Sequence, residues 1–136
     1  MKIFAKALAT LCFAGVLSYA ENWNGKLVDA TCYDSQHSGA TAATTGGAPH
    51  TMDRKARESL SKTCAPTAST TSFAIMRTDG KVYKLDNEGN TKAAEAMKNG
   101  SLKADNDGDV HVSLNGTSQG DSVKVDSLHG RAEHHK

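Results

Sequence analysis

The sequence has few aromatic residues, few cysteines, no long apolar run after its first twenty residues, and no excess of charge of either sign. One Trp, three Tyr and three Phe stand among 136 residues, and Phe4, Phe13 and Tyr19 belong to that N-terminal segment. Basic side chains number 16 and acidic ones 15. Binding to phosphate backbones or to anionic membranes without regard to sequence requires an excess of positive charge. We therefore expect no nucleic-acid partner.

The first twenty residues have the three parts of a secretory signal peptide. Two lysines precede the apolar run Ala7–Leu17, and Ser18-Tyr19-Ala20 supplies small residues for cleavage before Glu21. A buried N-terminal helix is the alternative. The run is too short to span a bilayer. The sequence thus predicts an exported protein, periplasmic or extracellular, with no membrane anchor after cleavage and with about 116 residues left for one small domain.

Removal of the signal takes Cys12 away and leaves Cys32 and Cys64. Two cysteines in a small exported chain most often form a disulfide, because the compartment is oxidising and the core is small. Closing a loop of about 33 residues contributes about 3–4 kcal/mol in the chain-entropy model. A catalytic thiol and half of a metal site are the alternatives, but no C-x-x-C pair is present. We predict a Cys32–Cys64 disulfide.

Alternation of apolar and polar residues predicts five short strands. They cover Trp23–Ala30, Thr71–Thr78, Lys81–Asp86, Asp109–Asn115 and Ser122–Leu128. Asp79-Gly80 predicts a tight hairpin between the second and third strands. Asn115-Gly116 and Gly120 predict turn structure between the last two, which are therefore expected to form a second hairpin.

A loop and a short helix are expected between the first two strands. The segment Asp34–His50 is rich in Ser, Gly, Ala and Thr, so it buries too little apolar surface to order itself and is expected to be a loop. Thr51 is the predicted N-cap of a helix that carries Leu60 on its apolar face and that Cys64 ends.

A second helix is expected between the third and fourth strands, from an N-cap at Asn90 through Lys98, with Gly100 as its stop. Five strands with a helix in that position is the order of the OB-fold, a small Greek-key barrel. The expected fold class is mainly β, an OB-fold-like β-barrel of five strands with one or two short helices, over residues 21–128. Residues 129–136 are expected to form a polar tail. A five-stranded sheet with helices on one face would have the same order.

The mature chain opens with Trp-x-Gly-x-Leu-Val-Asp and a cysteine, and a second cysteine precedes a Thr/Ser-rich strand. These residues are Trp23, Gly25, Leu27, Val28, Asp29, Cys32, Cys64 and Ala68–Ser72. The pattern resembles that of small exported bacterial proteins of unknown function. The layout is also similar to that of bacterial periplasmic OB-fold proteins, although the long insertion after the first strand departs from it. Neither resemblance brings an assigned activity or catalytic residues.

Histidines are the most prominent candidate ligands. His129, His134 and His135 stand close together near the C-terminus, where neutral imidazoles can hold copper, nickel or zinc weakly. His37 and His50 of the predicted loop can join such a site. A solvated tail that binds nothing is the alternative, because a metal site needs ligands held in fixed geometry. No other cofactor is expected.

The segment Asp105–Asp109 contains alternating carboxylates, but its glycine and the residue at position twelve, Gly116, do not match an EF-hand. We interpret it as an acidic turn leading into a strand. His111 alternates with the valines of that strand and is expected on its exposed face. Neither a P-loop nor a Gly-x-Ser-x-Gly motif is present, so no catalytic residues are assigned.

These observations favour an exported, non-enzymatic binding module for a small molecule, an envelope glycan or a protein partner. Two other classes of function stay open. One is a metal-handling protein that uses the C-terminal histidines, and the other is a small hydrolase with an unrecognised site.

Overall fold

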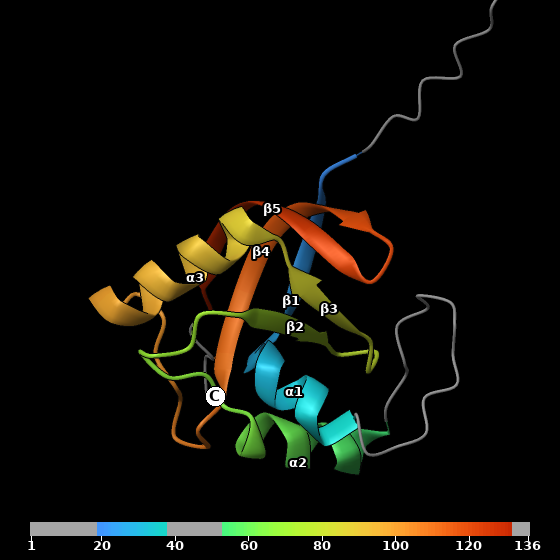
Figure 1. Cartoon of the computed structure of the whole chain (residues 1–136), viewed down its shortest axis with the longest axis vertical. Helices are drawn as coiled ribbons and strands as arrows, with labels where there is room; N and C mark the ends of the chain where they lie inside the picture. Colours follow the sequence, from blue (N-terminus) through green and yellow to red (C-terminus); the bar gives the residue numbers. More distant parts are fainter. Residues whose placement is uncertain (1–18, 38–52, 132–136) are drawn as a thin grey trace, which may run out of the picture.

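The computed structural model describes residues 19–37 and 53–131, and five strands within these residues close into a barrel (Figure 1). The strands are β1 Glu21–Asp29, β2 Phe73–Arg77, β3 Val82–Leu85, β4 Val110–Gln119 and β5 Ser122–Gly130. Their order is β1-β2-β3-β5-β4, with β3 and β5 parallel and the other pairs antiparallel. The predicted OB-fold-like barrel is confirmed, and the alternative of a five-stranded sheet with helices on one face is wrong.

The barrel interior is filled by alternate residues of the strands, because successive side chains point to opposite faces. Its largest buried side chains are Trp23, Leu27, Phe73, Ile75 and Leu114 of the strands, together with Leu102, which follows helix α3, Asn87–Asn99. Helix α3 packs on this core through Ala93. Gly100 ends the helix in the left-handed conformation, at φ 78°, as predicted.

Helix α3 begins four residues earlier than the sequence suggests. Its N-cap is Asp86, whose Oδ1 accepts from Gly89 N at 2.9 Å and from Val125 N at 3.2 Å. The predicted N-cap, Asn90, lies within the helix, and its Oδ1 accepts from Phe73 N at 2.8 Å. Asp86 takes the cap position because its carboxylate accepts hydrogen bonds from both the helix and β5. Asn90 instead links α3 to β2.

A second, smaller core lies on the outer face of β1, β2 and β3, under α1 and α2 (Figure 1). Helices α1, Ala30–His37, and α2, Arg54–Thr63, cover outward-facing side chains of the strands. These strand residues are Val28, Ala74, Met76 and Val82. The predicted disulfide joins Cys32 to Cys64, with the two Cα atoms 5.5 Å apart. None of the helices within residues 19–37 and 53–131 is long and apolar enough to cross a membrane.

Helix α1 occupies the start of the segment predicted to be a loop, so that prediction is wrong for residues 34–37. The reason is local. Asp29 Oδ1 accepts from Cys32 N at 3.0 Å, which satisfies an N–H group of the first turn, and Ala30 and Tyr33 are buried one turn apart. Helix α2 is capped by Asp53, which accepts from Ala56 N, and the predicted cap, Thr51, lies outside the described residues.

The last two strands are longer than predicted. Asn115-Gly116 does not turn the chain but forms an irregularity within β4, and the chain turns at Gly120-Asp121. A Cβ on Gly116 would lie 2.3 Å from Lys124 O, so this glycine permits a close approach of two strands. Because β5 continues to Gly130, His129 belongs to a strand and not to the predicted tail.

Gly25 allows β1 to approach β2 where the two strands pair. A Cβ at this position would lie 2.3 Å from Met76 O and 2.9 Å from Met76 C. The Gly25→Ala substitution is therefore expected to destabilise the protein by about 1–3 kcal/mol, since backbone must move to relieve the overlap. Urea denaturation followed by circular dichroism measures this change. The Gly120→Ala variant serves as the comparison. No atom lies within 4 Å of a Cβ at Gly120, so only the backbone φ of 70° disfavours alanine. An unchanged midpoint in Gly25→Ala would contradict the close approach.

Candidate functional site

A pocket of about 250 Å³ lies on the outside of the barrel, where the segment inserted between β1 and β2 meets the barrel wall. Helix α2 contributes Arg54, Arg57 and Glu58. The strands β1, β2 and β4 contribute Asn24, Gly25, Lys26, Met76, Arg77 and His111, and Thr78 and Arg131 follow β2 and β5. Side chains from five separate segments therefore surround one cavity.

The pocket lining is strongly basic, although the whole chain is nearly neutral. Its cationic side chains are Lys26, Arg54, Arg57, Arg77 and Arg131. Glu58 is the one acidic side chain among the described residues that line it. Arg54 Nε lies 3.1 Å from Glu58 Oε1, but the two side chains are 85 and 52% exposed, so the pair neutralises Arg54 only weakly. Two acidic residues outside the lining, Asp109 and Asp79, pair with Lys26 at 2.6 Å and with Arg77 at 3.9 Å. The net positive charge of the lining therefore comes mainly from Arg57 and Arg131.

Two of the arginines are held in place by neighbours within the fold. Arg57 Nη1 donates a hydrogen bond to the carbonyl of Thr78, which joins α2 to the end of β2. The Arg77 guanidinium lies over the indole of Trp23, 4.7 Å from the ring centroid. A guanidinium fixed in this way loses less conformational entropy when it binds an anion.

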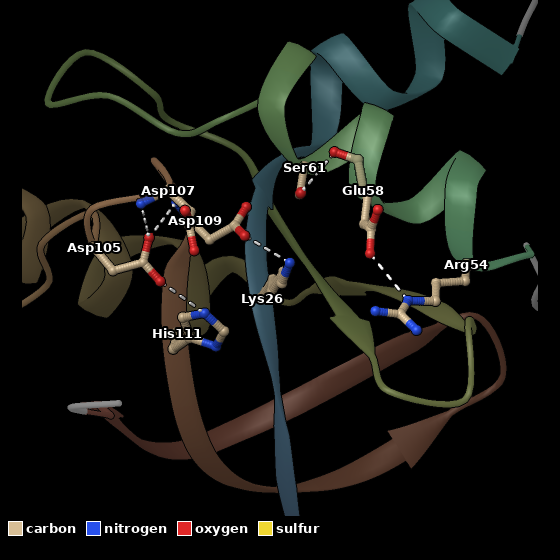
Figure 2. A network of polar contacts seen from close by, with 8 residues as sticks. All are labelled: Lys26, Arg54, Glu58, Ser61, Asp105, Asp107, Asp109 and His111. Atoms are coloured by element: carbon tan, nitrogen blue, oxygen red, sulfur yellow. Dashed lines mark hydrogen bonds and ion pairs between the residues drawn. The ribbon is translucent and has the colours of Figure 1, made fainter. Parts of the chain in front are cut away.

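Lys26 and His111 are paired residues on β1 and β4, and both contact acidic side chains of the turn before β4 (Figure 2). Lys26 Nζ lies 2.6 Å from Asp109 Oδ2, and His111 Nε2 lies 3.1 Å from Asp105 Oδ2. The His111 side chain is only 16% exposed. The expectation of an exposed strand face is therefore wrong for His111, because the acidic turn folds back over it.

Asp105 is oriented by the backbone of its own turn. Its Oδ1 accepts from Asp107 N at 2.9 Å and from Asp109 N at 3.0 Å. Partial burial raises the pKa of Asp105, but these two N–H donors and the neighbouring His111 lower it more, so the net pKa lies below the usual value. The carboxylate therefore stays ionised at neutral pH. The interpretation of this segment as an acidic turn leading into a strand is confirmed.

The structure does not assemble the predicted histidine site among the residues it describes. His129 is exposed on β5, opposite Ser113, and His37 is the last residue of α1. His50, His134 and His135 lie outside the described residues, so the weak copper, nickel or zinc site stays a prediction.

Sequence reasoning missed the basic pocket altogether. Its cations come from positions 26, 54, 57, 77 and 131, and only Arg54 and Arg57 lie near each other in the sequence. The near-neutral composition also hides a local excess of positive charge. The one available signal is the pair Arg54 and Arg57, three residues apart on a helix and thus on one face. Searches of protein-family models, curated proteins and solved structures give no match for this chain.

Proposed function

We propose that this chain is an exported, non-enzymatic binding module that holds a small anionic molecule in the basic pocket. The observation that supports the proposal is the convergence of five cationic side chains and one carboxylate on a single cavity. Phosphate, sulfate and carboxylate groups share the chemistry that such a lining recognises, because guanidinium groups donate paired hydrogen bonds to their oxygens. The cavity volume favours a ligand of small size.

Helices α1 and α2 cover the outer face of the barrel, and this cover favours a small ligand rather than a polymer. OB-folds that bind oligonucleotides or oligosaccharides use the face of strands 2 and 3 and the neighbouring loops. In this chain the outward side chains of that face, Ala74, Met76 and Val82, are 0, 3 and 6% exposed beneath α1 and α2. The basic pocket lies at the border of this cover.

Export is part of the proposal and is supported by two observations. The Cys32–Cys64 disulfide is typical of an oxidising compartment. The sequence of residues 1–20 has the order of a signal peptide. Export is tested by the intact mass of the protein recovered outside the cytoplasm. That mass should equal the mass of a chain that begins at Glu21.

The charge of Arg57 is expected to contribute directly to ligand binding. Isothermal titration of the purified chain with phosphate, sulfate and citrate should show saturable binding of at least one of them, weakened by added salt. The Arg57→Met substitution keeps most of the aliphatic stem and should weaken that binding by about tenfold or more, as for a lost hydrogen bond to a charged group.

Lys62→Met is the matched control, because Lys62 lies on the same helix, is exposed and does not line the pocket. This variant should keep the affinity of the original chain. Equal loss in both variants would indicate a general charge effect. Absence of saturable binding for all three anions would contradict the proposed function.

A further inference from the structure

The turn before β4 gathers three side chains with metal-binding atoms. One carboxylate oxygen each from Asp105 and Asp109 and one imidazole nitrogen from His111 all lie within 4.8 Å of one another. The turn brings them together, since Asp105 N donates to Asp109 O at 2.8 Å and Gly108 adopts a φ of 86°. All three are partly or fully buried.

Asp109 provides a second and independent observation. Its side chain is 7% exposed, and Oδ2 is bound by Lys26. Its Oδ1 is buried and has no hydrogen-bond partner among the residues that the structure describes. A buried carboxylate oxygen without a donor is costly, and such groups call for a bound ion or water. The same carboxylate supplies one of the three clustered ligand atoms.

Asp105 is held ready to bind by its hydrogen bonds. The two backbone N–H groups that bind Oδ1 fix the carboxylate plane and leave Oδ2 beside His111 Nε2 (Figure 2). Orienting hydrogen bonds of this kind are common around metal ligands, because they fix the ligand before the ion arrives.

We propose that Asp105, Asp109 and His111 bind a divalent transition-metal cation, for which zinc is the probe. Two carboxylates with one imidazole suit zinc or manganese better than calcium or magnesium, which take all-oxygen sites. Binding replaces the contact between His111 and Asp105 with two bonds to the ion. The metal site borders the basic pocket, whose lining includes His111 and Lys26, but its two carboxylate ligands do not line that pocket.

Lys26 competes with the metal ion in this arrangement. Its ammonium group already neutralises Asp109 and would stand next to the bound cation, so it should limit the affinity. Removing the ammonium group should therefore tighten metal binding, whereas removing a ligand should weaken it. A purely structural network predicts no gain of affinity from the loss of Lys26.

The test measures zinc binding by competition with a fluorescent chelator, without added phosphate, in a full chain carrying His134→Asn and His135→Asn to remove the tail histidines. We expect one zinc ion per chain. His111→Gln and Asp109→Asn should each weaken binding by about tenfold or more. Lys26→Met should strengthen it.

Asp107→Asn is the matched control, because Asp107 lies in the same turn but is not one of the three clustered residues. It should leave the affinity unchanged. Circular dichroism of each variant shows whether it is folded. If Asp109→Asn does not fold, His111→Gln still decides the test. No zinc binding, or unchanged binding in His111→Gln, would overturn the proposal. So would an equal loss in Asp107→Asn.

Discussion

Replacing Trp23 with alanine is expected to lower the free energy of unfolding by about 3–5 kcal/mol, the range for large buried aromatic side chains. Trp23 is 2% exposed within the barrel. Its ring meets Tyr83 edge to face, with the centroids 4.7 Å apart, and its Nε1 donates to Gly116 O at 3.3 Å. The substitution leaves a cavity between three strands and removes the surface on which Arg77 rests.

The Trp23→Phe variant separates the effect of lost side-chain volume from the effect of lost aromatic packing. It keeps an aromatic ring beside Tyr83 but loses the hydrogen bond to Gly116, so it should cost less than half as much as alanine. Circular dichroism in a urea titration is the appropriate measurement, since both variants lack the single tryptophan of the chain. A cost of less than about 1 kcal/mol for Trp23→Ala, the average for any substitution, would place Trp23 outside the core.

Loss of the disulfide is expected to cost about 3–4 kcal/mol, because the unfolded chain is no longer closed into a loop. Cys32 and Cys64 are 32 positions apart and join α1 to the end of α2. Cys64 is 1% exposed and belongs to the core beneath these helices. Loss of the disulfide should therefore destabilise α1 and α2 more than the barrel.

The paired substitution Cys32→Ala with Cys64→Ala tests this expectation by thermal melting. The variant should melt well below the original chain, and reductant should lower the original to about the same temperature. The variant itself should not respond to reductant, which serves as the control. An unchanged melting temperature in the variant would show that the disulfide adds nothing to stability.

The barrel could be predicted from the sequence because local patterns determine it. The alternation in Val110, Val112 and Leu114 marks an inward face, and Asp79-Gly80 marks a tight turn, without knowledge of the rest of the chain. The cysteine count and the expected export were enough to predict the disulfide. Strand order favoured a closed barrel but did not exclude a five-stranded sheet with helices on one face, and the structure shows that the sheet closes.

Features set by contacts across the sequence were not predictable in this way. Asn115-Gly116 has the composition of a turn, but the approach of Lys124 makes it part of a strand. Helix α1 depends on Asp29 and on the burial of Tyr33 in the core that it shares with the distant strands β2 and β3. The basic pocket needs α2 to lie beside β1 and β2, which no local pattern encodes.

Anion binding in the basic pocket is tested most directly by nuclear magnetic resonance. Phosphate, sulfate and citrate are each added to the isotope-labelled chain, and the amide shifts are followed. Progressive, saturable shifts should concentrate at residues 24–26, 54, 57, 58 and 76–78, which line the pocket, and should diminish with added salt. Shifts confined to α3 and the end of β5, or no saturable shift with any of the three anions, would contradict the proposed function.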